Sequence, residues 1–271
     1  MVTGVSGRLR EIARQTVAIA ERGDYVNPDG ATVSIAAAVA ASLAGTRLYE
    51  PDEELPAGRP ADGPPAIEVT RESTLQAARR AGPGAATLVF ASAKNPGGGF
   101  LGGAVAQEES LARASALYTS QRTAPAFYDF HRHQRDLRYS DRVIYSPGVP
   151  VFRDDKGRLL GEAYTTAFLT AAAPNLGAIL RNQSEDAGDV PAVLRRRAAR
   201  VLRVAAAHGH RTLVLGAWGC GVFRNLPVEV AAAFAAALRE VPCFDNVVFA
   251  IYDRLPHTPV HAVFAEAFGD D

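Results

Sequence analysis

Apolar residues recur at two different spacings along this chain, and the change of spacing separates helices from strands. Helical spacing, with charge on the opposite face, marks residues 6–22, 73–81, 191–210, 227–241 and 259–268. Short apolar runs typical of strands occupy residues 67–70, 86–93, 164–174, 212–219 and 246–253. The run at 86–93 is apolar throughout, which suits a sheet covered on both faces. This alternation predicts an α/β fold with three layers, α/β/α, around a parallel or mixed central sheet.

The first quarter of the chain departs from that alternation. Two helices are expected there, at 6–22 and 35–44. Residues 45–66 are rich in Pro, Asp, Glu and Gly, with Arg47–Tyr49 as their only strand-like piece. We therefore predict an N-terminal helical extension, residues 1–66, packed on a main domain of residues 67–271. The apolar run at 31–45 falls short of the about 20 residues that cross a bilayer, so we expect a buried helix there.

Two further segments carry mixed signals. From Gln107 onward, one helical face is formed by Leu111, Ala114, Leu117 and Tyr118, which predicts a single helix. Residues 142–160 contain strand pieces interrupted by Pro and Gly, with a DDKG turn, and predict an inserted hairpin.

Charge and composition narrow the range of partners. The 271 residues include 29 Lys and Arg against 29 Asp and Glu, so an anionic ligand needs a local site, and non-specific DNA or membrane binding is not expected. Lysine occurs only at Lys94 and Lys156, a bias that we attribute to coding composition. Cys220 and Cys243 lack a metal-ligand spacing and form either a disulfide or, as a cytosolic protein favours, two reduced thiols. No segment resembles a signal peptide, so we expect a cytoplasmic protein.

A glycine-rich loop, Asn95–Ala106, follows the strand at 86–93. Its residues 97–102 match the pattern G-x-G-x-x-G of a dinucleotide fingerprint. That interpretation is disfavoured, because the loop continues to Ala106 and the region about 20 residues on is helical instead of the end of a second strand. Three consecutive glycines still let backbone N–H groups approach an anion or a sugar hydroxyl. A flexible turn is the alternative, but the position at a strand's carboxyl end favours a ligand site.

Gln107, Glu108 and Glu109 follow at the start of the predicted helix. Acidic residues are common in a first turn because they complement the helix dipole, so capping explains them when they are taken alone. Beside the glycine loop they become candidates for acid–base chemistry. Successive helical residues point about 100° apart, so the two carboxylates cannot flank a glycosidic bond, and one should transfer the proton while the other holds hydroxyls. The dipole favours an ionised carboxylate, so a general acid here needs burial or a negative neighbour to raise its pKa.

A second loop of the same kind, Leu215–Asn225, follows the strand that begins at residue 212. Its glycines present backbone N–H groups ahead of a helix that begins near Pro227, an arrangement suited to a diphosphate. Phe223 either stacks on a ligand or simply packs. Cys220 has no identifiable His or Asn partner, which favours a structural thiol over a nucleophile.

Together, NPGGG at 95–99, a seven-residue spacer, QEE at 107–109 and WGCGVF at 218–223 closely resemble the microbial-type poly(ADP-ribose) glycohydrolases, a catalytic branch of the macrodomain fold. The resemblance extends to the surrounding text and to the N-terminal helices, so it covers most of the chain. It implies that residues 67–271 are a macrodomain-like catalytic domain. It also implies hydrolysis of ribose–ribose O-glycosidic bonds in poly(ADP-ribose), from chain ends, with release of ADP-ribose.

The same resemblance implies roles for single residues. Glu109 would be the general acid that protonates the leaving ribose hydroxyl, and then the base that deprotonates water. Glu108 and Asn95 would hold ribose hydroxyls, and Gln107 would order the loop. The distal ribose and diphosphate would be lined by Gly97, Gly98 and Gly99. A second diphosphate loop would be formed by Gly219, Cys220, Gly221, Val222 and Phe223.

No metal or other cofactor is implied by the resemblance. The expected partners are poly(ADP-ribose), ADP-ribose and ADP-ribosylated proteins, and the N-terminal extension would close the far end of the cleft. Two alternatives stay open. A macrodomain that binds terminal ADP-ribose without cleaving it is disfavoured by QEE, because a binding module needs no carboxylate at the scissile bond. A hydrolase of mono-ADP-ribosylated proteins would use the same fold.

Overall fold

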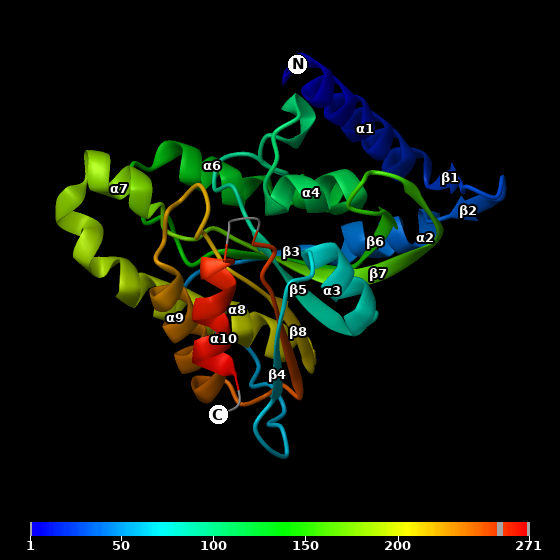
Figure 1. Ribbon diagram of the computed structural model, residues 1–271. Helices are drawn as coiled ribbons and strands as arrows, with labels where there is room; N and C mark the ends of the chain where they lie inside the picture. The colour runs from blue at the N-terminus through cyan, green and yellow to red at the C-terminus, as the bar shows by residue number, and fades with distance from the viewer. Residues whose placement is uncertain (1, 254–256, 270–271) are drawn as a thin grey trace.

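A seven-stranded mixed sheet forms the centre of the protein, whose computed structural model describes residues 2–253 and 257–269 (Figure 1). The strand order is β3-β6-β7-β5-β8-β9-β4. The strands are β3 (Arg47–Tyr49), β4 (Ala66–Thr70), β5 (Ala85–Phe90), β6 (Val143–Arg153), β7 (Leu159–Ala171), β8 (Thr212–Leu215) and β9 (Asn246–Ala250). In this sheet β6 pairs antiparallel with both of its neighbours, and the other pairs are parallel.

Helices cover both faces of this sheet (Figure 1). One face is covered by α8 (Val190–Ala207), α9 (Pro227–Glu240) and α10 (Pro259–Phe268). The other is covered by α1 (Val2–Arg22), α2 (Ala36–Gly45), α3 (Thr74–Ala81), α4 (Gln107–Ala114) and α5 (Leu117–Gln121). Successive strand residues point to opposite faces, so Leu88 of β5 is buried in the first core and Val89 in the second. A strand between two helical layers therefore presents apolar side chains to both faces, as β5 does apart from the buried Thr87.

The N-terminal segment contributes to the sheet as well as to a helical layer. Between α1 and α2, β1 (Asp24–Val26) and β2 (Thr32–Ser34) form a small separate sheet. The predicted strand-like piece at 47–49 is β3, which joins the main sheet beside β6. The segment after β3 runs to the face of the sheet that α8 and α9 cover, where the Ala61 N–H donates to Pro242 O, just after α9, at 2.8 Å. No helix in the described part of the chain is long and apolar enough to span a bilayer.

The prediction of a single helix from Gln107 to Tyr118 is wrong, because the segment forms two helices with a break at residues 115–116. α4 ends at Ala114 and α5 begins at Leu117. Between them, the hydroxyl of Ser115 donates to Leu111 O at 2.7 Å and accepts the Leu117 N–H at 3.2 Å, and its backbone is extended. Serine competes for backbone groups in this way, which favours the end of a helix over its interior.

Three other expectations need correction. β6 and β7 form no insertion but two long strands of the central sheet, joined by the predicted turn, and β7 unites two pieces that were predicted separately. α2 is only partly buried, because Val39 and Ser42 face inward while most of its alanines are exposed. The prediction also omits α6 (Pro125–His133), α7 (Leu176–Asn182) and the short 3-10 helices η1 (Phe100–Gly102) and η2 (Ser184–Asp189).

Candidate active site

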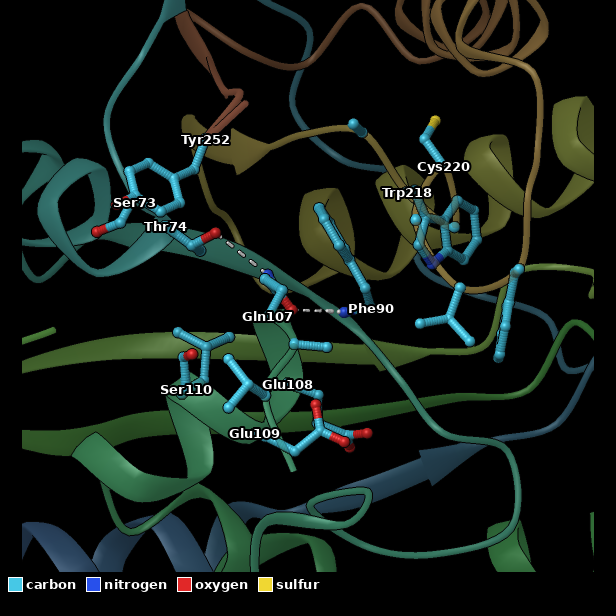
Figure 2. Close-up of a pocket in the computed structure, with 18 of the residues that line it drawn as sticks. Ser73, Thr74, Phe90, Gln107, Glu108, Glu109, Ser110, Trp218, Cys220 and Tyr252 are labelled. Atoms are coloured by element: carbon cyan, nitrogen blue, oxygen red, sulfur yellow. Dashed lines mark hydrogen bonds between the residues drawn. The ribbon is translucent and has the colours of Figure 1, made fainter. Parts of the chain in front are cut away.

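A cavity of about 1040 Å³ lies at the carboxyl ends of the parallel strands. Phe90 and Ala250, the last residues of β5 and β9, line it, together with the loops that follow β5 and β8. Open α/β sheets bind ligands at this end. Figure 2 shows the carboxyl groups of Glu108 and Glu109 close together on α4, with Trp218 and Tyr252 on other sides of the same space.

Nine of the twelve predicted site residues line this cavity: Asn95, Gln107, Glu108, Glu109, Gly219, Cys220, Gly221, Val222 and Phe223. The other three, Gly97, Gly98 and Gly99, are not among its lining residues and form a turn beside the carboxylates. Gly98 has φ +59°, and a Cβ there would lie 2.4 Å from Glu109 Oε1 and 3.2 Å from Glu108 Oε2. Only glycine lets the backbone come this close to both carboxyl groups.

The two glutamates differ in exposure. Glu109 is partly exposed, and its Oε1 accepts the Gly99 N–H at 3.0 Å. Glu108 is 2% exposed, and its two oxygens accept the Ser92 N–H at 2.6 Å and the Gln121 amide at 2.9 Å. Burial raises the pKa of Glu108 to about 8, although these hydrogen bonds oppose the shift. The carboxyl group with the raised pKa is therefore that of Glu108, the more buried of the two glutamates, and not that of the more exposed Glu109.

Two glutamine side chains connect the glycine turn and the first turn of α4 to neighbouring elements. The Gln107 amide accepts the Phe90 N–H at 2.9 Å and donates to Leu88 O at 2.8 Å, so it joins the first turn of α4 to the end of β5 (Figure 2). Gln121 of α5 accepts the Gly97 N–H at 2.7 Å while donating to Glu108. Gln121 is fully buried and was outside the predicted site. In the sequence, Gln121 shows only as an amide next to the apolar positions of α5, which does not by itself indicate a site residue.

The second glycine loop has a similar construction. Gly219 has φ +73°, its carbonyl accepts the Asn225 N–H at 3.0 Å, and a Cβ would lie 2.4 Å from the Asn225 amide. The Phe223 ring lies 6.1 Å from that of Tyr139, a cavity residue with φ +60° that was not predicted. Cys220 and Cys243 are both free thiols, as predicted, and burial raises the pKa of Cys220 to about 12. A thiol with that pKa is a poor nucleophile, which favours a structural role.

Comparison with known proteins identifies the relatives of this chain. The family model described as "Microbial-type PARG, catalytic domain" matches residues 13–154. The structure of poly(ADP-ribose) glycohydrolase (PARG) from Thermomonospora curvata is 53% identical, with 97% of this chain and 100% of that chain covered and a TM-score of 0.90. The chain belongs to the microbial-type PARG family.

Other structures of this family match as well. The Thermomonospora curvata enzyme bound to the inhibitor ADP-HPD is 52% identical, with 97% and 100% of the two chains covered and a TM-score of 0.86. PARG from Deinococcus radiodurans in complex with ADP-ribose is 44% identical, with 85% and 96% covered and a TM-score of 0.80. The comparison with curated proteins gives no match. The predicted macrodomain-like α/β/α fold with a mixed sheet is confirmed.

The cavity of this PARG-family chain extends beyond the predicted residues. Ser73 and Thr74 at the start of α3, with Tyr252 after β9, line one end of it (Figure 2). Both lysines of the chain, Lys94 beside Asn95 and Lys156 on the β6–β7 turn, line it too, so their positions are more informative than composition suggested. Within the described ranges, no group of three or more His, Cys, Asp and Glu side chains is placed to hold a metal ion.

Proposed function

We propose that this PARG-family protein hydrolyses ribose–ribose O-glycosidic bonds of poly(ADP-ribose) from chain ends, with Glu109 as general acid and then general base. The observation that carries the proposal is the position of Glu109. Its carboxyl group is partly exposed in a cavity between two glycine loops, and the Gly99 N–H holds one oxygen so that the other is available. A general acid has to lie within hydrogen-bond reach of the oxygen it protonates.

In the first step, Glu109 gives its proton to the bridging oxygen as the bond from that oxygen to the anomeric carbon breaks. The departing chain then leaves with a ribose hydroxyl, and positive charge develops on the anomeric carbon. In the second step, ionised Glu109 takes a proton from a water molecule whose oxygen bonds to that carbon, which releases ADP-ribose and restores the acid.

Glu108 would hold the ribose that reacts. Because its pKa is about 8, Glu108 keeps a proton at neutral pH. Both of its oxygens already accept hydrogen bonds from the protein, so the carboxyl O–H is the group left to donate to a ribose hydroxyl. Asn95, which lines the same part of the cavity, would hold a second hydroxyl.

The diphosphate and the adenine of ADP-ribose would lie further along the cavity. The backbone of Gly219–Phe223 would bind the diphosphate, since successive N–H groups in a glycine loop attract anions. The adenine would then reach the opposite end, where Tyr252 offers an aromatic face and α3 offers the hydroxyls of Ser73 and Thr74.

Residues 1–66 would act as the extension that limits attack to chain ends, with residues 67–271 as the catalytic domain. α1 contacts two segments near the cavity: the Ser6 hydroxyl donates to Gly102 O in the glycine loop at 3.5 Å, and Arg8 Nη2 donates to the carbonyl of Lys156, a cavity residue, at 3.3 Å. ADP-ribosylated proteins would be the carriers of the polymer. A cytoplasmic location agrees with two free thiols, because that compartment keeps thiols reduced.

Two substrates test the proposal: poly(ADP-ribose) of defined length and a mono-ADP-ribosylated protein. We expect ADP-ribose as the first and main product from the polymer, and no release from the mono-modified protein. Early release of oligomers would contradict action from chain ends. Release from the mono-modified protein alone would instead support the related hydrolase, and binding of ADP-ribose without release from either substrate would support a non-catalytic macrodomain.

A further inference from the structure

We infer that Arg113 is a positioning residue of this active site: it holds the loop Gly99–Ala104 in place so that the Gly99 N–H stays on the carboxylate of Glu109. The inference rests on the proposed function of Glu109. It assigns a role to a buried cation that the glycine loops and the QEE sequence do not account for.

Glu109 and Arg113, on one face of α4, form hydrogen bonds with the two ends of the loop Gly99–Ala104. They are four residues apart, a separation that places side chains on the same side of a helix. Glu109 Oε1 accepts the Gly99 N–H at 3.0 Å, and Arg113 Nη1 donates to Ala104 O at 2.6 Å. Arg113 is 7% exposed, so water offers little competition for this bond.

The loop is a closed unit, so its two ends move together. The Gly99 carbonyl accepts the N–H of Gly102 at 3.0 Å and that of Ala104 at 3.1 Å. A Cβ on Gly99 would lie 2.9 Å from the Cβ of Ala104, so these two residues are in close contact. Because Ala104 is bonded to Gly99, a displacement of the carbonyl that Arg113 holds would also displace the N–H that Glu109 accepts.

α1 blocks the outer side of the same loop. A Cβ on Gly103 would lie 2.8 Å from Ser6 O, so the helix backbone passes directly over the loop. Thr16 of α1 also donates to the Arg113 carbonyl at 2.7 Å, which fixes the backbone from which the guanidinium extends. The loop is therefore held between α1 and Arg113.

The charge of Arg113 has a specific neighbour. None of the ion pairs found among the described residues includes Arg113, although burying a guanidinium is costly without a partner. Burial lowers the pKa of Arg113, and the negative charge of Glu109 opposes that shift. Attraction between the two groups is strongest when Glu109 is ionised, which is its state after it has protonated the leaving oxygen.

The test compares Arg113→Met and Arg113→Lys with a matched control, Arg200→Met. Arg200 is also 7% exposed and donates to two backbone carbonyls, those of Glu50 and Glu53, but it is not a cavity residue. We expect R113M to lose about 10²-fold in kcat, because small displacements in an active site cost about that much, with KM changed less than about threefold. R113K keeps a donor and the charge, so it should lose less than about tenfold. R200M should lower Tm without changing kcat.

Two further measurements separate positioning from general destabilisation. The affinity for ADP-ribose in R113M should stay close to that of the wild type, because the substitution leaves the residues that line the cavity in place. Hydrogen exchange of the peptide 97–106 should be faster in R113M than in the wild type, and unchanged in R200M. If R113M does not fold, Arg113→Gln replaces it, since a glutamine is too short to reach Ala104.

A kcat and an exchange rate in R113M equal to those of R200M would overturn the inference. So would equal losses of kcat in R113M and R113K. The exchange comparison does not depend on catalysis. If the wild-type protein failed to cleave poly(ADP-ribose), the proposed function would fail, and exchange at 97–106 would still decide whether Arg113 holds the loop.

Discussion

At the scale of single residues, Glu108 and Glu109 show how two adjacent glutamates come to lie in different environments. Both line the cavity, but Glu108 is almost fully buried and accepts hydrogen bonds from a backbone N–H and an amide, whereas Glu109 is partly exposed. The expectation that only one of them acts at the scissile oxygen, drawn from the divergence of adjacent helical residues, stays a prediction, although the two carboxyl groups lie close together (Figure 2). Sequence reasoning could not tell that the raised pKa belongs to Glu108, since burial depends on α5 and on Gln121, which lies outside the motif.

Glu109→Gln should abolish most of the activity on poly(ADP-ribose). We expect a loss of about 10³-fold in kcat, within the range that proton transfer contributes, because the amide can neither donate the acidic proton nor accept one from water. Product release from the polymer measures this loss. The Tm and the affinity for ADP-ribose should stay close to those of the wild type, and retention of full activity would exclude Glu109 as the acid.

Glu108 should make stability depend on pH. Its pKa rises from 4.5 to about 8 on folding, so between these values the folded state holds a proton that the unfolded chain has released. Stability therefore falls as pH rises, by about 1.4 kcal/mol per unit for one proton, and it levels off above about pH 8. In Glu108→Gln this slope should be absent. Denaturant unfolding at pH 6, 7 and 8 measures it, and identical slopes in the two proteins would contradict the assignment.

At the scale of elements, the sequence was most informative where one pattern repeated over a whole strand or helix. α8, α9 and α10 were predicted to within three residues of their observed bounds, because few alternative structures accommodate a long apolar stripe. β5, β8 and β9 begin within one residue of the predicted start, but each ends three or four residues earlier than predicted. Prediction failed where a local side-chain bond decided the outcome, as at Ser115. It also missed Tyr139, since a left-handed tyrosine in an irregular loop has no periodic signal.

The glycine turn can be tested within one element. Gly98→Ala would force a Cβ into the Glu109 carboxylate at a residue with positive φ, so we expect at least about a tenfold loss of kcat and a lower Tm. Gly102→Ala is the matched control, because it lies in the adjoining turn η1 and its Cβ would meet no atom within 4 Å. Activity equal to that of G102A would show that the close approach at Gly98 is unimportant.

At the scale of the whole molecule, three histidines whose pKa values are lower in the folded protein oppose the effect of Glu108. His131 Nδ1 donates to Phe127 O, the neutral ring accepts the Ser140 hydroxyl at Nε2, and burial lowers the pKa of His131 to about 4. Burial also lowers the pKa of His208 and of His210, whose rings contact Tyr145 on the sheet. In each case the unfolded chain binds a proton near pH 6.5 that the folded protein does not take up until a lower pH.

We therefore expect stability to fall most steeply with pH above about pH 6.5. Between about pH 4.5 and 6.5, the three histidines, which are protonated only on unfolding, oppose the loss that Glu108 causes as pH rises; above about pH 6.5 Glu108 acts without that opposition. Thermal unfolding between pH 5 and 8 should therefore show a Tm that depends less on pH below pH 6.5 than above it. In His131→Gln the Tm below pH 6.5 should decline more with rising pH than in the wild type, and an unchanged profile in that variant would contradict the balance.

The two lysines of the chain have a practical consequence. Lys94 and Lys156 are both exposed, and both line the cavity. Reagents that acylate primary amines would therefore attach, apart from any terminal amine, at the rim of the substrate site. Coupling the protein to a sensor surface through its amines would obstruct the binding that the sensor is meant to record. Used at low dose, the same acylation would instead report on occupancy, because bound ADP-ribose would shield both side chains from the reagent.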